Sequence, residues 1–369
     1  MRLRTLRRWA VAMTVALGWS LASGLSAAAA AGFAAAASRP FGVTAWLPYW
    51  EMPAALNSTL AGASAIGTAS PYWYEIVGDA RVHAEAGAGS ATVLSDLHAS
   101  GVQIVPMVTE RAGMGQFARI LASTSRRAAL VRTLVRLASP AGYAGLDIDF
   151  ESFAYDPGHR AALADRLAKL YPAFVSQACA ALHAIARTCQ VAVMARTSGG
   201  HSYAHADIPS WVYDYRALAA AADRIQVMAY DYHSPGGPAG PIAPLPWVRQ
   251  VIAYARSQAP ASRYELGLPA YGYQWYGRTS ASAVYANQLA GVLAQAHVHA
   301  RWDATAAEET FSYGTHRHRH VGWVATTRSD RERARLAARA GFAGVAVWAA
   351  GYEQPTLWPS LRLPALGGR

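Results

Sequence analysis

One short segment, Gly145 to Glu151, constrains the fold and the chemistry of this chain more than any other. Its sequence, GLDIDFE, sets three carboxylates at alternate positions of an otherwise apolar run. Alternate side chains share one face of a β-strand, so Asp147, Asp149 and Glu151 are expected to point one way. Like charges on a buried face repel, and burial disfavours each charged form. The pattern therefore predicts a carboxyl group with a raised pKa, which a general acid near neutral pH requires.

Two other interpretations of this acidic strand stay open. Carboxylates at this spacing can bind calcium or magnesium, and acidic residues can also stand at a strand end without a function. A metal-binding loop usually brings asparagine and turn residues, which this strand lacks. The pattern favours catalysis.

Residues 1–37 are interpreted as a signal peptide with an Ala-rich leader. Four arginines within the first eight residues precede an apolar stretch from Trp9 to Leu25, and residues 26–37 offer several A-x-A cleavage sites. An uncleaved membrane anchor is the alternative, because the apolar stretch is long. We expect cleavage near Ser38 and an exported protein, secreted or associated with the cell envelope, that has no membrane contact after cleavage.

The remaining residues, 38–369, suit one large α/β domain with an ample core. The formal net charge is +11, and Lys169 is the only lysine. A basic exported protein is attracted to anionic polymers such as cell-wall material. The arginines are scattered and form no nucleic-acid-binding motif, so we expect no nucleic-acid partner, and we expect a monomer.

Two cysteines, Cys179 and Cys189, are present. In an oxidising compartment they can close a short loop between a helix end and the strand that follows it. Two buried free thiols are the alternative. The predicted export favours the disulfide.

The order of predicted elements indicates a parallel sheet with crossover helices. Strands are predicted at 42–47, 65–70, 102–108, 145–151, 191–196, 224–230, 264–269 and 344–348. Helices are predicted at 90–100, 123–138, 159–186, 215–222, 245–258 and 329–340. Eight strands with intervening helices favour a closed (β/α)₈ TIM barrel over an open sheet.

Residues 272–328 are too long for a single helical crossover between the last two strands. The segment is rich in aromatic residues and alternates as β-structure does near 309–313 and 320–325. We interpret it as a small α+β insertion that forms one wall of a cleft.

Polar and aromatic residues gather at the predicted carboxyl ends of the strands, where barrel enzymes hold their active sites. We therefore expect substrate contacts from Tyr49, Trp50, Arg196, Tyr271 and Trp275. In a chain so rich in aromatic residues, some of these side chains are expected to be structural.

Three motifs resemble glycoside hydrolase family 18, the chitinase-like barrels. Residues 144–151 match the family signature D-G-x-D-x-D-x-E except at Ala144, M-x-Y-D appears from Met228 to Asp231, and G-[VI]-x-x-W ends at Trp348. The segments 214–215, 230–233, 240–247 and 267–275 look most like the branch of spore-cortex-lytic N-acetylglucosaminidases. Ala144 removes a carboxylate that pairs with the next one in many chitinases.

The resemblance implies retaining hydrolysis without an enzymic nucleophile. The 2-acetamido group of the substrate attacks the anomeric carbon, while Glu151 protonates the leaving oxygen and later activates water. Asp149 would orient the acetamido N–H, and Asp147 would share a proton with Asp149. Tyr230 would bind the acetamido oxygen. No metal and no cofactor take part.

Substrate contacts are implied for three further residues of these motifs. Trp348 would form an apolar floor beneath the sugar, and Met228 and Asp231 would contact it. Packing of the barrel is the alternative for Trp348, and capping of a loop is the alternative for Asp231.

A run of alternate histidines, His316, His318 and His320, raises a metal-binding hypothesis. The run contains no carboxylate or cysteine that would complete a site, and a solvated basic loop is the favoured interpretation.

The sequence thus predicts an exported hydrolase that cleaves β-linked N-acetylglucosaminyl bonds of peptidoglycan or its fragments. Hydrolysis of chitin or chitooligosaccharides is one alternative. A non-catalytic, chitinase-like glycan-binding protein is the other, although such relatives commonly replace the acid that Glu151 provides here.

Overall fold

The computed structural model describes residues 41–155, 161–200, 203–204, 208–315 and 318–363. The predicted signal peptide and leader, residues 1–37, lie outside the described residues. Within the described ranges, no helix is long and apolar enough to cross a membrane.

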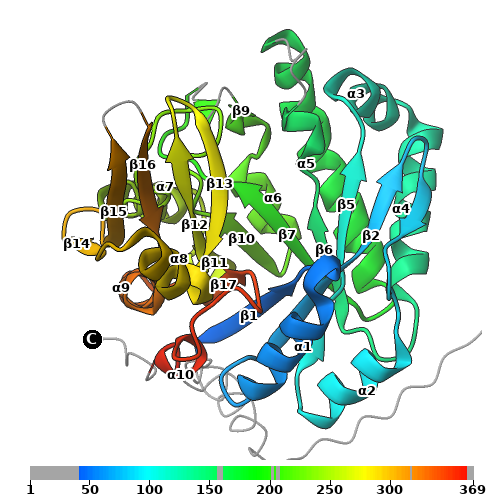
Figure 1. Cartoon of the computed structure of the whole chain (residues 1–369). Coiled ribbons are helices and arrows are strands. Elements are labelled where there is room, and N and C mark those ends of the chain that lie inside the picture. The colour runs from blue at the N-terminus through cyan, green and yellow to red at the C-terminus, as the bar shows by residue number, and fades with distance from the viewer. Residues whose placement is uncertain (1–40, 156–160, 201–202, 205–207, 316–317, 364–369) are drawn as a thin grey trace, which may run out of the picture. The chain divides into compact units, whose positions relative to one another are not determined.

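Eight parallel strands among the described residues form a closed barrel (Figure 1). Around the barrel the strands follow the order β1, β17, β11, β10, β7, β6, β5 and β2, and β2 pairs with β1 to complete the ring. Their bounds are β1 (Gly42–Leu47), β2 (Thr68–Val77), β5 (Met107–Arg111), β6 (Gly145–Asp149), β7 (Thr188–Met194), β10 (Arg224–Met228), β11 (Tyr264–Pro269) and β17 (Gly344–Trp348). The predicted TIM barrel is confirmed.

The strand bounds differ from the prediction mainly where a strand continues beyond the ring. Strand β2 covers 68–77 instead of 65–70, because its second half pairs antiparallel with the short strand β3 (Arg81–Ala84). Strand β6 ends at Asp149, so Glu151 belongs to the loop that follows rather than to the strand. A two-residue strand, β4 (Gln103–Ile104), precedes β5.

Helices surround the strands (Figure 1). They are α1 (Met52–Ala61), α2 (Ala91–Ala99), α3 (Met114–Ala122), α4 (Thr124–Ala138), α5 (Ala161–His183), α6 (Tyr215–Ala221), α7 (Leu245–Gln258), α9 (Thr327–Arg339) and α10 (Leu357–Ser360). The helices α1, α3 and α10 were not among the predicted segments. The others lie within a few residues of their predicted bounds.

Local sequence explains where several of these helices begin. The side chains of Ser90, Ser123 and Asp214 accept hydrogen bonds from the backbone N–H three residues later and cap α2, α4 and α6. Gly145 is the first residue of β6, and any side chain there would collide with the carbonyl oxygen of Thr188 on β7. The acidic strand and its neighbour can therefore approach closely only with glycine at this position.

The segment between β11 and β17 forms a second, antiparallel sheet. Its strands are β12 (Tyr271–Tyr276), β13 (Ser280–Tyr285), β14 (Arg301–Asp303), β15 (Glu308–Thr315) and β16 (His318–Val324), in the order β13, β12, β16, β15 and β14. Helix α8 (Leu289–Ala296) lies between β13 and β14 in the chain. This arrangement is the α+β insertion predicted between the last two barrel strands.

A disulfide bond joins Cys179, near the end of α5, to Cys189 in β7, as predicted. Both residues are fully buried in the core between the helices and the barrel. The bond joins α5 to β7, which is the strand that pairs with β6.

Candidate active site

The acidic strand delivers its carboxylates to the interior of the barrel, as the alternation predicts. Leu146, Ile148 and Phe150 are fully buried in the main core. Asp147 and Asp149 occupy the other face and are 0% and 6% exposed. The partly exposed Glu151 lies beyond the strand end, so the three carboxylates form a series from the barrel interior to its mouth.

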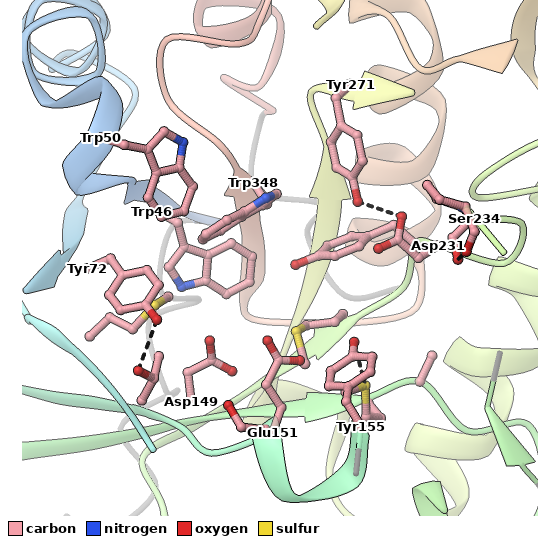
Figure 2. A pocket seen from close by; sticks show the side chains of 18 of the residues that line it. Trp46, Trp50, Tyr72, Asp149, Glu151, Tyr155, Asp231, Ser234, Tyr271 and Trp348 are labelled. Carbon is pink, nitrogen blue, oxygen red and sulfur yellow. Dashed lines mark hydrogen bonds between the residues drawn. The ribbon is translucent and has the colours of Figure 1, made fainter. Parts of the chain in front are cut away.

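A cavity of about 390 Å³ opens at this end of the barrel (Figure 2). Three carboxylates from two strand ends reach it, namely Asp149, Glu151 and Asp231. Its remaining wall is aromatic, apolar or hydroxyl-bearing, and no arginine, lysine or histidine belongs to the described lining. The wall is formed by Trp46, Trp50, Tyr72, Met107, Thr109, Ser152, Tyr155, Met194, Ala195, Met228, Tyr230, Ser234, Pro235, Trp247, Tyr271 and Trp348.

Asp147 lies beneath the cavity and is not part of its lining. Its Oδ2 accepts hydrogen bonds from the indole N–H of Trp46 and the hydroxyl of Ser70, both at 2.8 Å. Burial raises the pKa of Asp147 to about 7, although these two donors favour the charged form. Asp147 can therefore hold a proton at neutral pH.

Asp149 stands between two other acids. Burial, followed by the charges of Glu151 and Asp147, raises the pKa of Asp149 well above its ordinary value. One oxygen of each aspartate, Oδ1, is buried without a hydrogen-bond partner among the described residues. A proton on one of the two carboxyl groups would supply the missing donor, since two ionised acids so close together repel strongly.

Glu151 has the properties of a general acid. Burial raises the pKa of Glu151 to about 8, with further contributions from the charges of Glu110 and Asp231. A hydrogen bond with the Tyr155 hydroxyl acts in the opposite direction. A carboxyl group in this state is protonated at neutral pH and can donate to a leaving oxygen.

Asp231 is held from the side of the insertion. Its Oδ1 accepts hydrogen bonds from the hydroxyl groups of Tyr271 at 2.7 Å and Tyr273 at 3.1 Å, both on β12. Burial raises the pKa of Asp231 to about 6. The backbone of Asp231 is left-handed, with φ of 59°, a conformation that aspartate tolerates better than most residues. The residue therefore links β10 to the insertion sheet.

Tyr230 keeps its proton in this surrounding. Burial and the nearby charges of Glu151 and Asp149 raise the pKa of Tyr230 well above its ordinary value. The hydroxyl is thus available as a hydrogen-bond donor within the cavity.

Three tryptophans form an apolar wall that faces Asp149 and Glu151 in Figure 2. The ring of Trp348 lies 6.2 Å from that of Trp46 and 6.1 Å from that of Trp50, both in edge contacts. A cis peptide bond joins Trp348 to Ala349. A sugar ring placed between this wall and the carboxylates would contact an apolar surface on one side and acids on the other.

Eight of the twelve residues predicted for the site line the cavity, and four do not. Asp147 lies below it, and Tyr49 supports it indirectly through edge contacts with Trp50 and Tyr72. The other two, Arg196 and Trp275, are 5% and 1% exposed. The residues that do line it are Trp50, Asp149, Glu151, Met228, Tyr230, Asp231, Tyr271 and Trp348.

Arg196 and Trp275 have structural surroundings instead of cavity contacts. The guanidinium of Arg196 donates to the carbonyl oxygen of Tyr213 at 2.9 Å and lies 5.1 Å from the ring centre of Tyr254. The indole N–H of Trp275 donates to the carbonyl oxygen of Gly237 at 3.2 Å. The expected substrate contacts of these two side chains receive no support from their positions.

Several lining residues were missed by the sequence analysis. Trp46 is the penultimate residue of β1, and Tyr155 and Trp247 lie in helices beyond the strand ends. Thr109 pairs with Asp149 across neighbouring strands, and its hydroxyl donates to that of Tyr72 at 3.0 Å. Tyr72 and Thr109 follow the predicted ends of their strands, and Trp46 lies close to the predicted end of its strand, which was the available signal for all three.

The histidine run forms no metal centre among the described residues. His316 lies outside them, His318 is exposed, and the ring of His320 stacks on that of Tyr313 at 4.6 Å. Within the described ranges, no group of three or more histidine, cysteine, aspartate or glutamate side chains is arranged to hold a metal ion.

Comparisons with curated proteins identify related glycosylases. The uncharacterized glycosylase YvbX of Bacillus subtilis (strain 168) is 29% identical over 248 residues, which cover 66% of this chain and 68% of that protein. The cortical fragment-lytic enzyme of the same organism is 31% identical over 152 residues, which cover 40% of this chain and 35% of the enzyme. The latter match thus spans about a third of that relative.

Solved structures share the fold. A chitinase from Chromobacterium violaceum ATCC 12472 superposes with a TM-score of 0.77 at 27% identity, over 89% of this chain and 100% of that one. The spore cortex-lytic enzyme SleL from Bacillus cereus superposes with a TM-score of 0.76 at 21% identity, over 88% and 74%.

The family sequence model described as glycosyl hydrolases family 18 matches residues 83–353. This range contains all three motifs on which the resemblance was based, and it contains Asp149, Glu151, Asp231 and Trp348 of the cavity. The chain is therefore a hydrolase that belongs to glycosyl hydrolase family 18.

Proposed function

We propose that this enzyme is an exported, retaining hydrolase that cleaves β-linked N-acetylglucosaminyl bonds of peptidoglycan fragments by substrate-assisted catalysis. One observation carries the proposal: Asp149 and Glu151 face a tryptophan wall across the cavity, and both have raised pKa values. The arrangement provides a protonated acid, a second carboxyl group beside it and an apolar surface for a sugar.

In the first step, the acetamido oxygen of the bound sugar attacks its own anomeric carbon. The bond from this carbon to the leaving oxygen breaks, and Glu151 transfers its proton to that oxygen. Asp149 accepts a hydrogen bond from the acetamido N–H and balances the positive charge of the cyclic oxazolinium. The Tyr230 hydroxyl donates to the acetamido oxygen and directs its approach.

In the second step, water attacks the anomeric carbon from the side that the leaving group vacated. Glu151, now ionised, accepts a proton from this water, and the carbon–oxygen bond of the oxazolinium breaks to restore the acetamido group. Two inversions at one carbon give net retention. The enzyme returns to its starting protonation state.

The charge of the cavity favours a neutral sugar at the reacting position. Three carboxylates and no basic side chain belong to the described lining. N-acetylglucosamine carries no charge, whereas N-acetylmuramic acid with a free lactyl group carries a carboxylate that has no basic partner in the described lining. The reacting unit is therefore N-acetylglucosamine.

Peptidoglycan is supported by the cortical fragment-lytic relatives and by the charge of the chain. The net charge of +11 would attract the protein to anionic wall polymers, and the basic and apolar N-terminus is typical of exported proteins. The second candidate substrate is chitin or its oligosaccharides, which is favoured by the similarity to a chitinase over 89% of the chain.

Product analysis tests the proposal and separates the two substrates. Purified peptidoglycan fragments and chitohexaose would be digested in parallel and the reducing-end sugars identified by mass spectrometry. We expect faster release of products ending in reducing N-acetylglucosamine from peptidoglycan. Faster cleavage of chitohexaose would indicate that chitin oligosaccharides are the substrate.

The stereochemistry of the first product tests the mechanism. Proton NMR before mutarotation should show the β-anomer, and a thiazoline analogue of the cyclised intermediate should inhibit strongly. An α-anomeric product, or a 2-fluoro sugar trapped covalently on Asp149, would replace the proposed route by a two-carboxylate mechanism.

A further inference from the structure

Glu110 is a buried carboxylate that the proposed mechanism does not use. It belongs to β5, and the preceding residue, Thr109, pairs with Asp149 and lines the cavity. Successive side chains of a strand point to opposite faces, so Glu110 lies on the outer side of the barrel wall. It is 1% exposed, and glutamate is rarely buried to this degree unless the carboxylate has bonding partners.

Both oxygens of Glu110 are bound by the backbone that follows Glu151. The N–H of Ser152 donates to Oε2 at 3.1 Å, and the N–H of Phe153 donates to Oε1 at 2.7 Å. These two N–H groups open the short helix η2 (Ser152–Tyr155), where the first N–H groups have no partner within the helix. The carboxylate thus fixes the chain on one side of the acid.

The chain on the other side of the acid is held as well. The hydroxyl of Tyr213 donates to the carbonyl oxygen of Phe150 at 2.9 Å, and the ring of Phe150 is fully buried. Because Glu151 stands in a loop beyond the end of β6, no strand pairing fixes it directly. Its direction depends on these two flanking anchors.

We propose that Glu110 is a positioning residue for Glu151, which anchors the acid's backbone from behind the strand and, as an anion, helps the acid to keep its proton. The inference rests on the proposed function, in which Glu151 is the general acid. It assigns to a residue outside the cavity a role in the protonation of a residue inside it.

Two hydrogen bonds favour the ionised form of Glu110. Burial raises the pKa of Glu110 well above its ordinary value. The hydrogen bonds from the N–H groups of Phe153 and Ser152 act in the opposite direction. Backbone N–H groups bind an anionic carboxylate more strongly than a neutral one. Both oxygens of Glu110 accept bonds of this kind, so the geometry favours its ionised form.

Several elements contribute the other titratable groups that interact with Glu151, and none of those within the described ranges is basic. They are the acids Asp149 and Asp231 and the tyrosines Tyr155, Tyr171, Tyr213 and Tyr230. The tyrosines are neutral at the pH values concerned, because burial raises their pKa values. Removal of the charge on Glu110 therefore reduces the negative charge near Glu151.

Two variants separate the charge from the anchor. Glu110→Gln keeps the shape and one acceptor but removes the charge, whereas Glu110→Asp keeps the charge but shortens the reach to the two N–H groups. Glu75→Gln is the matched control, because Glu75 is 5% exposed, stands on the next strand and bonds Arg111 instead of the loop after β6. The readout is the dependence of kcat/KM on pH, with KM and kcat measured separately.

In Glu110→Gln, the fall of kcat/KM at high pH should move to lower pH by about one pH unit, since a like charge near the acid is lost. In Glu110→Asp, the fall should stay in place while kcat drops about tenfold and KM changes less than about threefold. In Glu75→Gln, the profile should stay that of the wild type. A pH profile unchanged in Glu110→Gln, or a uniform loss at every pH in both variants, would overturn the inference.

Glu151→Gln, measured in parallel, separates the two levels of the proposal. If Glu151→Gln is inactive and Glu110→Gln has an unshifted profile, only the inference fails. If Glu151→Gln stays active, the proposed function fails and the inference falls with it. Should both Glu110 variants fail to fold, carbon-13 NMR of the wild-type carboxyl groups gives the answer, and independent titration of Glu110 and Glu151 would contradict the coupling.

Discussion

The indole N–H of Trp46 donates a 2.8 Å hydrogen bond to Oδ2 of Asp147. The two residues are 101 positions apart in the chain, on β1 and β6. Trp46 is also part of the tryptophan wall and packs edge-on against Trp348. One bond therefore connects the apolar wall of the cavity with the deepest carboxyl group of the acidic strand.

Removal of this bond should alter the protonation of the acidic strand. Trp46→Phe keeps an aromatic ring but deletes the donor, so the pKa of Asp147 should rise above its value of about 7. We expect kcat to fall about tenfold. Carbon-13 NMR titration of the aspartate carboxyl groups measures the change. Trp50→Phe is the control, because the indole N–H of Trp50 donates to the hydroxyl of Tyr352, and it should leave the pKa of Asp147 unchanged. An equal shift in both variants would contradict the assignment.

Replacement of the acid should abolish turnover without abolishing binding. Glu151→Gln removes the transferable proton and preserves the shape of the side chain, so kcat should fall by about three orders of magnitude or more on substrates with poor leaving groups. Calorimetric titration with an N-acetylglucosamine oligosaccharide should give an affinity within about threefold of the wild type. Near-native turnover would show that another group protonates the leaving oxygen.

The activity should be lost at high pH with the proton of the acid. Glu151 must be protonated before the first step, and its pKa is about 8. The value of kcat/KM should therefore fall as the pH rises through this value. Initial rates from about pH 3.5 to about pH 10 on one unactivated oligosaccharide give the curve. A fall near the ordinary pKa of glutamate, about 4.3, would contradict a protonated Glu151.

The buried aspartate should make the protein less stable as the pH rises. The pKa of Asp147 is raised in the folded state, to about 7 from an ordinary 3.8. The folded state thus binds the proton more tightly, and the associated stability is present below pH 4 and lost as the pH rises through 7. Asp147→Asn should remove this component, up to about 4 kcal/mol.

Urea denaturation at pH 4.5 and pH 8 measures that component. The free energy of unfolding of Asp147→Asn, taken as a difference from the wild type, should be higher at pH 8 than at pH 4.5, because the wild type has lost its Asp147 component at pH 8. Asp96→Asn, at a partly exposed site on α2, offers a control. An equal difference at the two pH values would mean that Asp147 is ionised throughout.

Loss of the disulfide should destabilise the protein but spare the active site. The closed loop between Cys179 and Cys189 is short, so the double substitution to alanine should lower the free energy of unfolding by about 2–3 kcal/mol. Neither cysteine touches the cavity, and kcat should stay within about twofold of the wild type. Thermal unfolding with and without reductant provides the measurement. An unchanged unfolding temperature would show that the bond contributes nothing to stability.

The local geometry of the acidic strand follows from its own residues. Alternation along a strand is a property of the backbone, so the spacing of Asp147, Asp149 and Glu151 was enough to place them on one side. The order of strands and helices was likewise sufficient for a barrel, because parallel strands need crossover connections and eight of them favour closure. The three motifs of the family then indicated a hydrolase.

The distant side chains that surround these acids could not be predicted, because they are brought there by the closed barrel. Trp46 reaches Asp147, and Glu110 reaches the loop after β6, through contacts that depend on the register between strands and on the closure of the ring. Arg196 illustrates the converse, because it follows a barrel strand closely and yet bonds the backbone of Tyr213. A side chain's neighbours along the strand follow from its own position, whereas its neighbours across the barrel follow from the packing of the whole domain.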